Sequence, residues 1–566
     1  FDEGLHQVPV QRNWRTNILS KLLTGDITFE VVIDPDYEDD YNLYPDNNDD
    51  KSVVSVTTAE EITNAIKNAT SDITLYFANK ITGNVNVEQK KDIDVIVNGN
   101  NFEFDGVITL KSTCGQSGAS LKIQNLNFVT TSATDLDFIS SKERNSNTHN
   151  LTISNCTFTG QGTGDIVALR IRHGKDITFE NCKATGLHSL MWATGTRNIK
   201  VSGVELTDCK NGVHFGTATG HVIENSTIKT ISKYGYGVRV DAAAAEPQAS
   251  LTVKNCTLEG DAPVLVRKSI AGTQYALNFE GNNTLITSKA YHIITTADDY
   301  EEGTELTVPT GTVNITGANG YNVYPMENTS EMNASSDAQL SSVIAAGATT
   351  VNLTPGTYII PDDAKGKTLT FIGIGNPEDT KIATQDDGSY EGCDYSLDGA
   401  TVTFENITIN TNSHTYTGYA RCKGTYKNCV INGTYTLYDD SNFENCTFNV
   451  SGDVYNIWTW GAPNATFDKC TFNSDGKAML LYGTENTNLK IENSVFNDKG
   501  GLTDLKAAIE IGNDYGKSYT LVVNNTVVNG YEINDKGINT GTTLWANKNS
   551  MGKDKLSVTV DGKKVY

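Results

Sequence analysis

The chain repeats one short phrase, and this repeat limits the folds that are open to it. Each copy reads apolar residue, polar residue, Asn, small residue and, in most copies, Thr. Clear copies are FENCTFNV from Phe443, ISNCTFTG from Ile153, FENCKATG from Phe179 and VKNCTLEG from Val253. The copies recur at intervals of roughly 25 residues, which suits a coil of three short strands and three turns. A helical repeat would instead place apolar residues at i, i+3 and i+4.

Alternation inside the phrase indicates strands. In LTVKNCTLEG, the apolar Leu251, Val253, Cys256 and Leu258 face one way, with a bend at Asn255. Asn adopts the left-handed backbone of such a bend more readily than other non-glycine residues. When coils stack at the parallel-strand spacing of about 4.8 Å, equivalent Asn side chains lie above one another and can hydrogen-bond along the axis.

The residues after the bend indicate a packed interior. A small residue comes first, often Cys, and Phe158, Phe448 and Phe472 follow as interior fillers. A free Cys behaves there as a small hydrophobic residue. The ten cysteines are expected to be free, because stacked neighbours have parallel Cα–Cβ directions that suit a disulfide poorly. No cofactor is expected, since a linear stack does not converge as metal ligands must.

With these repeats, the sequence resembles the right-handed parallel β-helix proteins of the pectate-lyase-like superfamily. The resemblance covers the chain from about residue 52 to its end. It implies an all-β solenoid. It leaves the activity open, because that superfamily includes lyases, hydrolases, phage tailspikes and adhesins.

Two amphipathic stretches suggest how the solenoid is divided. TTAEEITNAIKNAT has a capping box from Thr58 to Glu61, and SSDAQLSSVIAAG repeats the pattern from Ser336 to Gln339. Each is interpreted as a short helix that caps the N-terminal end of a β-helix, whose open edge would otherwise invite aggregation. We therefore expect two tandem β-helices, at 52–325 and 326–566. The alternative is one long solenoid with an internal insertion.

The N-terminal residues differ from the rest. HQVPVQRNWRTNILSKLLTGDITFEVVID resembles the last strands of fimbrillin-like domains from surface proteins of Bacteroides-type bacteria. Residues 1–33 are therefore expected to be a remnant of such a domain, and the acidic 34–51 a linker. The resemblance implies a secreted protein at the outer cell surface, lipid-anchored through an N-terminal region that this sequence lacks.

Charge and hydropathy exclude two classes of partner. The formal net charge is −24 and the isoelectric point is about 4.7, so the surface repels the phosphates of nucleic acids. No apolar run is long enough to span a membrane.

A stripe of cationic and aromatic residues breaks the Thr, Asn and Lys pattern of the outward positions. It lies in VALRIRHG, LMWATG, GVHFG, GVRVD and PVLVRK, which are expected to occupy successive coils. The candidate ligand-binding residues are Arg170, Arg172, Trp192, His214, Arg239 and Arg267.

Two interpretations of the stripe are open. In the first, it binds an acidic polysaccharide or a host glycan, because Arg pairs with uronate carboxylates and Trp stacks on sugar rings. His214 or an Arg would then be placed to abstract a C5 proton if the protein were a lyase. In the second, the stripe is a solvated face whose cations offset nearby carboxylates such as Asp241.

A second patch is predicted in the C-terminal half. Trp458, Trp460, Tyr482, Glu510 and Asp514 fall on successive coils, where two carboxylates could serve glycoside hydrolysis. Alternation sends about half of such residues inward. The motifs of polygalacturonases of this fold, NTD and GHG, are absent.

The sequence thus favours a surface adhesin or glycan-binding protein without catalysis and with no catalytic residue assigned. A polysaccharide lyase or glycosidase acting on an acidic polysaccharide is the first alternative, and a structural stalk is the second.

Overall fold

A computed structural model describes residues 52–566, apart from 132, 142–147, 163, 217–218, 242–247, 268–273, 387–391, 413–415, 476, 501–506, 513–514 and 532–543. The fimbrillin-like remnant predicted at 1–33 and the linker at 34–51 lie outside the described residues.

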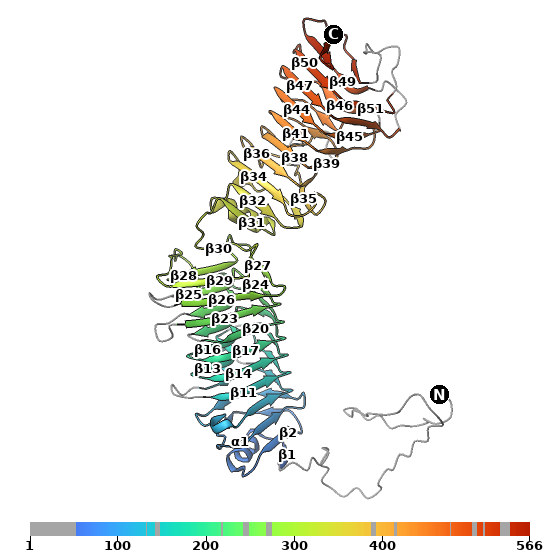
Figure 1. Ribbon diagram of the computed structural model, residues 1–566. Helices are drawn as coiled ribbons and strands as arrows, with labels where there is room; N and C mark the ends of the chain where they lie inside the picture. The colour runs from blue at the N-terminus through green and yellow to red at the C-terminus, as the bar shows by residue number, and fades with distance from the viewer. Residues whose placement is uncertain are drawn as a thin grey trace, which may run out of the picture. The chain divides into compact units, whose positions relative to one another are not determined.

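The described strands form six sheets in two sets of three, and no sheet contains strands of both sets (Figure 1). In the first set, the chain visits sheets I, II and III in turn. Sheet I comprises β1 (Ser52–Val56), β2 (Ile73–Phe77), β5 (Val95–Asn98), β8 (Leu121–Gln124), β11 (His149–Ser154), β14 (Lys175–Glu180), β17 (Arg197–Ser202), β20 (His221–Glu224), β23 (Gln248–Lys254), β26 (Gln274–Glu280) and β29 (Thr312–Thr316). Sheet II comprises β3 (Ile81–Thr82), β6 (Glu103–Asp105), β9 (Asn127–Val129), β12 (Thr157–Thr159), β15 (Lys183–Thr185), β18 (Glu205–Cys209), β21 (Thr227–Thr230), β24 (Thr257–Glu259) and β27 (Thr284–Ile286). Sheet III comprises β4 (Val85–Val87), β7 (Ile108–Leu110), β10 (Leu136–Ser140), β13 (Ile166–Arg172), β16 (Ser189–Thr194), β19 (Asn211–Gly216), β22 (Tyr236–Asp241), β25 (Ala262–Arg267), β28 (Ile293–Thr296) and β30 (Val323–Tyr324).

In the second set, the strands up to β39 belong to sheets IV and V, and sheet VI begins at β40. Sheet IV comprises β31 (Glu331–Ala334), β32 (Thr350–Leu353), β34 (Thr368–Gly373), β36 (Thr401–Glu405), β38 (Lys423–Lys427), β41 (Ser441–Glu444), β44 (Asn464–Asp468), β47 (Thr487–Glu492), β50 (Tyr519–Asn524), β53 (Leu556–Val560) and β54 (Lys563–Lys564). Sheet V comprises β33 (Gly356–Tyr358), β35 (Thr380–Ala383), β37 (Thr408–Asn410), β39 (Val430–Asn432), β42 (Thr447–Asn449), β45 (Thr471–Ser474), β48 (Val495–Asp498) and β51 (Val527–Asn529). Sheet VI comprises β40 (Tyr435–Thr436), β43 (Ile457–Trp458), β46 (Lys477–Leu481), β49 (Ala507–Ile511) and β52 (Trp545–Asn547).

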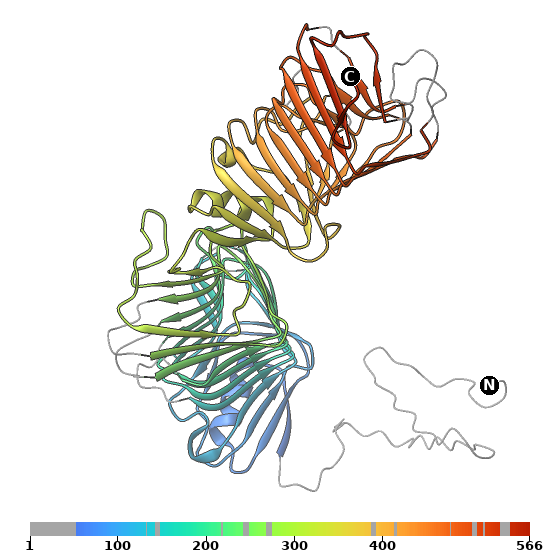
Figure 2. The ribbon, with the colours of Figure 1, turned by 45° about the horizontal axis from the view of Figure 1, so that its top comes forward.

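Among the strands described, neighbours pair in parallel except β53 and β54. The all-β class with long parallel sheets is as predicted. Figure 2 shows the sheets of the first set arranged around a common interior.

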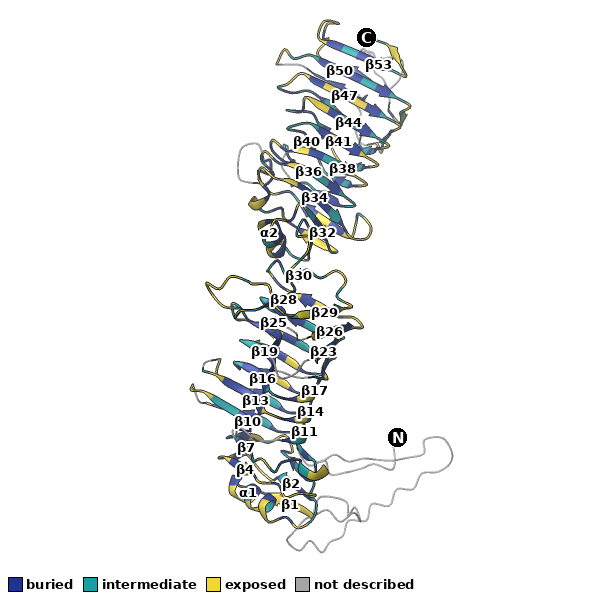
Figure 3. Ribbon diagram, turned by 60° about the vertical axis from the view of Figure 1, so that its left-hand side comes forward, coloured by how far each residue is buried: buried dark blue, intermediate teal, exposed yellow. Residues whose placement is uncertain are grey.

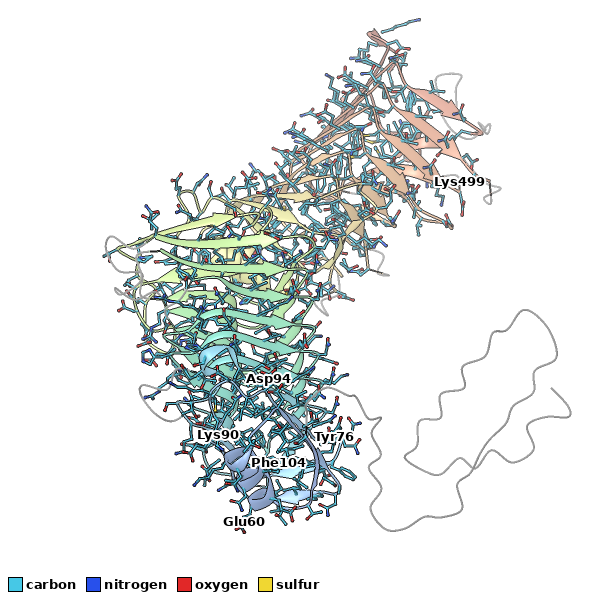
Figure 4. All side chains as sticks on the ribbon, turned by 60° about the horizontal axis from the view of Figure 1, so that its bottom comes forward. Glu60, Tyr76, Lys90, Asp94, Phe104 and Lys499 are labelled. Atoms are coloured by element: carbon cyan, nitrogen blue, oxygen red, sulfur yellow. The ribbon has the colours of Figure 1, made fainter. Side chains whose placement is uncertain are left out.

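Four short helices interrupt the described strands. They are α1 (Ala59–Asn68), η1 (Gln116–Gly118), α2 (Asp337–Ala345) and η2 (Asp362–Ala364). Helix α1 begins at the predicted capping box, since the Thr58 hydroxyl accepts from the Glu61 amide and the Glu61 carboxylate accepts from the Thr58 amide. Its Glu60 points outward in Figure 4, whereas Phe104 lies inside the coils and is fully buried. Neither α-helix in this part of the chain is long and apolar enough to cross a membrane.

The predicted Asn bends are present. Asn155, Asn255 and Asn445 have φ values of 53°, 51° and 53°, and Asn428 donates through Nδ2 to Oδ1 of Asn406 one coil earlier, at 2.6 Å. Asn thus supplies both the left-handed turn and a hydrogen bond along the axis.

Sheet V carries a second Asn ladder that the repeat did not predict. Each Nδ2 donates to the Oδ1 one coil earlier, at 2.9 or 3.0 Å, along the series Asn410, Asn432, Asn449, Asn473, Asn497 and Asn529.

The interior consists of like residues stacked on like residues. Phe448 and Phe472 have ring centroids 4.8 Å apart, and the centroids of Phe128 and Phe158 are 4.7 Å apart, close to the strand spacing of about 4.8 Å. All ten cysteines are buried thiols outside any disulfide. Buried positions alternate with half-buried or exposed ones along many strands in Figure 3. The coils bury separate large cores in the first and second sets.

Candidate functional site

Sheet III carries the predicted stripe on its outer face. The register aligns Arg170 on β13 with Trp192 on β16, His214 on β19 and Arg239 on β22. Leu265 on β25 continues this row. The residues on either side of Arg170 and His214 in the strands, such as Leu169, Ile171, Val213 and Phe215, are buried, so alternation turns the row outward.

Three of the predicted residues line one pocket. Arg170, Arg172 and Trp192 surround a space of about 270 Å³ together with His173 and Thr194. The Arg170 guanidinium lies over the Trp192 ring, 4.8 Å from its centroid, and its Nε donates to Asp137 Oδ1 at 2.7 Å. Arg172 is exposed, and within the described residues its guanidinium makes no ion pair.

The backbone after β13 shapes the rim of this pocket. His173 has a left-handed φ of 54°. Gly195 faces it one coil later, where an added β-carbon would lie 2.7 Å from His173 Nδ1. A side chain at position 195 would therefore push the imidazole, and glycine keeps the rim free at this point.

His214 and Arg239 form a separate, closed group around Asp241. His214 Nε2 lies 2.9 Å from Asp241 Oδ2, and Arg239 Nε donates to Asp241 Oδ1 at 2.9 Å. His214 is only 2% exposed, and burial lowers its pKa despite the hydrogen bond to Asp241. Burial raises the pKa of Asp241, but hydrogen bonds from His214 and Arg239 outweigh this effect and leave the pKa below its usual value.

The far end of the stripe is covered by the segment 297–311 between β28 and β29. Tyr300 and Leu306 of this segment pack against the buried cluster of Tyr236, Ala262, Leu265 and Ile294. Arg267 pairs with Asp299 of the same segment. The six candidates therefore fall into two groups: Arg170, Arg172 and Trp192 share an open pocket, whereas His214, Arg239 and Arg267 lie outside it and are engaged by carboxylates.

The patch predicted in the C-terminal half is also divided. Trp458, Trp460 and Tyr482 lie together, and they are joined by Tyr416 and Tyr515, which the sequence reasoning missed. Glu510 is buried instead, and it accepts hydrogen bonds from Tyr455 and Lys548. Asp514 lies outside the described residues.

A further pocket, of about 420 Å³, lies beside the Asn ladder of sheet V. Asn432, Asn449, Thr434 and Lys499 contribute to its lining, and Figure 4 shows Lys499 near the C-terminal coils. Its walls combine amide and hydroxyl groups with the apolar side chains of Val450 and Val454. Among the described residues, no three or more His, Cys, Asp or Glu side chains gather as a metal site would require.

Family models match two parts of the chain. Residues 138–301, which include the pocket at Arg172, match the model described as right handed beta helix region. Residues 2–76 match a family of unknown function, DUF6562. A search of curated proteins found no match. The first match agrees with the parallel coils seen in the structure.

Several solved structures show a weak similarity. The PL6 family alginate lyase AlyGC has 11% identity and a TM-score of 0.27 over 90% of this chain and 99% of its own. PfbA, a surface adhesin of Streptococcus pneumoniae, has 12% identity and a TM-score of 0.25 over 83% and 88%. Tailspike protein 3 of bacteriophage CBA120 has 8% identity and a TM-score of 0.21 over 89% and 61%. Scores this low carry no information on the activity of this chain.

Proposed function

We propose that this protein is a non-catalytic, surface-exposed glycan-binding protein or adhesin that holds an acidic polysaccharide, such as a host glycan rich in uronates, in the pocket of sheet III. One observation carries the proposal. Arg172 presents an exposed guanidinium without an ion pair in the described residues, beside the half-buried Trp192.

The chemistry of the pocket suits a uronate. A guanidinium pairs with a carboxylate in a planar, two-point geometry, and an indole offers a flat apolar face to a sugar ring. Arg170 is already held by Asp137 and by the Trp192 ring. It therefore positions the indole, and Arg172 is the group that contacts the ligand.

The same geometry disfavours the lyase alternative at this stripe. A base must reach the substrate proton directly or through one water, and His214 is buried with Nε2 on Asp241. Arg239 is bonded twice to the same carboxylate.

The finer architecture belongs to the same proposal. We infer two tandem β-helices, at 52–325 and 326–566, with α1 and α2 as their N-terminal caps, behind a fimbrillin-like remnant at 1–33 and a linker at 34–51. The division of the sheets into two sets supports this inference, as does the position of α2 directly after β31, the first strand of the second set. The cell-surface location rests on the resemblance of the N-terminal residues to Bacteroides-type surface proteins.

The test is isothermal titration of the full chain with polygalacturonate and polymannuronate, with ultraviolet absorbance followed in parallel. We expect saturable binding that Arg172→Ala weakens about tenfold or more, the loss typical of one charge-assisted contact. Arg197→Ala is the matched control, because this exposed arginine lies on sheet I.

Two outcomes overturn the proposal. If neither polyuronate binds, or if Arg172→Ala and Arg197→Ala behave alike, the pocket is not the ligand site. If absorbance rises as the polymer is cleaved by elimination, the protein is an enzyme and the non-catalytic assignment is wrong.

A further inference from the structure

Five aromatic rings gather on the outer side of sheet VI. Ring centroids lie 4.8 Å apart for Tyr416 and Trp458, 5.6 Å for Trp458 and Trp460, and 6.1 Å for Trp460 and Tyr482. Tyr515 closes the group at 5.5 Å from Trp460 and 5.7 Å from Tyr482. We call these five residues the ring platform.

The platform is fixed by the coils beneath it and is open to solvent. The Trp458 indole N–H donates to the Tyr482 carbonyl at 3.0 Å. At Gly483, an added β-carbon would lie 2.0 Å from the Trp460 carbonyl oxygen, so only glycine allows this approach. Tyr515 is 49% exposed, and the other four rings are half-buried. A rigid set of rings that remains partly exposed is a feature of binding surfaces.

Polar groups continue the same outward rows. The register places Trp458, Leu480 and Glu510 in one row. Leu481, Ile511 and Asn547 are aligned across the next three strands. The residues that directly follow them, which are Tyr482, Gly512 and Lys548, form the next outward row. Gly512 has no side chain, and its β-carbon position lies 3.1 Å from the Tyr482 ring.

The two charged side chains in these rows, Glu510 and Lys548, neutralise each other. Lys548 Nζ donates to Glu510 Oε2 at 2.6 Å, and the Tyr455 hydroxyl donates to the same oxygen at 2.5 Å. Glu510 is 1% exposed, whereas the Lys548 side chain is 35% exposed. Lys548 also donates to the Tyr455 hydroxyl at 3.5 Å, so one of its three N–H groups is left to donate outward, and its charge is already compensated.

From this arrangement we propose that the ring platform binds a neutral glycan, such as a glucan or mannan chain. The apolar C–H faces of the sugars lie on the indole and phenol rings, and a hydroxyl group accepts from Lys548. Successive coils rise by about 4.8 Å, close to the length of one sugar ring, so rings from consecutive coils lie under consecutive sugars. Flat rings with a few placed polar groups are typical of small-ligand sites.

The charge of the site selects among ligands. An acidic glycan would need an uncompensated cation, as at Arg172. Lys548 and Lys477, which belong to the described part of this surface, are paired with Glu510 and Asp453. A proline-rich peptide also stacks on aromatic rings. Aromatic rings beside a neutralised ion pair suit a sugar better, because its hydroxyl groups can hydrogen-bond to the ion pair. The site differs from the Arg172 pocket in residues, sheet and ligand, so the inference stands independently of the proposed function.

The experiment is affinity electrophoresis of the full chain in gels that contain dextran, a soluble β-1,3-glucan or a soluble β-mannan, followed by titration with tryptophan fluorescence. We expect one of these polymers to retard the chain and to change its fluorescence. Trp460→Ala and Tyr515→Ala should each weaken binding about tenfold or more, as loss of a central aromatic contact does at interfaces.

Two variants keep the result interpretable. Tyr515→Ala alters a half-exposed side chain, so it should fold even if Trp460→Ala does not. Tyr76→Ala removes a half-buried tyrosine from β2, which is far from the ring platform in the sequence (Figure 4). This variant should bind as the unchanged chain does. Arg172→Ala should also leave this binding unchanged.

Three results overturn the inference. The first is that none of the three polymers retards the chain. The second is that Tyr515→Ala and Tyr76→Ala bind equally well. The third is that the chain captures a proline-rich peptide that the polymers do not displace. If the chain binds a neutral polymer but no polyuronate, only the proposal for the Arg172 pocket is refuted. If it binds a polyuronate but no neutral polymer, only the inference for the ring platform is refuted.

Discussion

His214 Nε2 lies 2.9 Å from Oδ2 of Asp241, in a position where alternation along the strand predicted an exposed imidazole. The two residues belong to adjacent coils, on β19 and β22. The Trp192 ring, 5.0 Å away, and the Tyr236 ring, 6.4 Å away, lie on either side of the imidazole in the neighbouring coils. The pair is therefore a structural element of sheet III.

Replacing Asp241 by Ala should destabilise the protein. Removal of the carboxylate leaves the buried imidazole and the Arg239 guanidinium without their shared partner, which costs about 2 to 3 kcal/mol in the free energy of unfolding. Urea denaturation at pH 7.5 measures the effect. Glu103→Ala is the control, because its ion pair with Lys80 is exposed and should matter little. Equal losses in the two variants would contradict the structural role of Asp241.

His221 should make stability depend on pH. Burial lowers the pKa of His221 to about 3 from its ordinary value of 6.5. Above pH 6.5 the side chain is neutral in both the folded and unfolded states. As the pH falls below 6.5, only the unfolded state gains the proton, so the free energy of unfolding decreases by roughly 1 kcal/mol per pH unit. His292, whose pKa burial lowers to about 4, acts in the same direction.

His221→Asn isolates this effect. Asn retains an acceptor for the Ile199 amide, which now donates to His221 Nδ1 at 3.2 Å, but it does not titrate. When the pH is lowered from 7.5 to 5, the urea midpoint should therefore fall less in the variant than in the unchanged chain. An equal fall in the two proteins would show that the pKa of His221 is the same in the folded and unfolded states.

Lys469→Asn should stabilise the second set of coils. Lys469 occupies the bend position that Asn fills elsewhere, with a φ of 55°, and a left-handed backbone costs a lysine more than an asparagine. The expected gain is up to about 1 kcal/mol. Lys490→Asn on β47 is the control, because this lysine lies within a strand, and it should bring no gain. The check is the change in the urea midpoint of each variant.

The cysteines should not react with an aromatic disulfide reagent in the folded protein. All ten are buried thiols outside any disulfide, so the reagent cannot reach them in the folded protein. Burial also raises the pKa of Cys114 to about 11 and that of Cys209 to about 12, which lowers the share of the reactive thiolate at these two positions. Colour should develop only after guanidinium is added, to the level of ten thiols. Fewer thiols in guanidinium would reveal a disulfide, and fast reaction without it would reveal an open coil.

The sequence was sufficient for the features that repeat. Asn at the bends, Cys and Phe in the interior and the outward turn of Arg170 each follow from alternation and from the stacking of identical positions. Stacking converts one local preference into many equivalent contacts, so a short phrase is enough to predict them.

Features that do not repeat could not be predicted in this way. The burial of Leu265 depends on the segment 297–311, which has no periodic pattern to indicate where it folds back. Tyr416 and Tyr515 lie outside the strands of sheet VI, so alternation gave no reason to group them with Trp460. Contacts of this kind depend on loop conformation, which a strand pattern does not determine.

The Asn ladder of sheet V has a consequence for how such a chain can change. Its rungs are joined at nearly constant length, yet successive rungs are separated by as few as 17 and as many as 32 residues along the sequence. Differences in length thus lie outside the ladder positions, and each Asn of the ladder offers its neighbours the same donor below and the same acceptor above. Insertions in a turn, or gain and loss of an entire coil, leave the remaining bonds in place. The protein can therefore acquire new outer surfaces one coil at a time, without redesign of its interior.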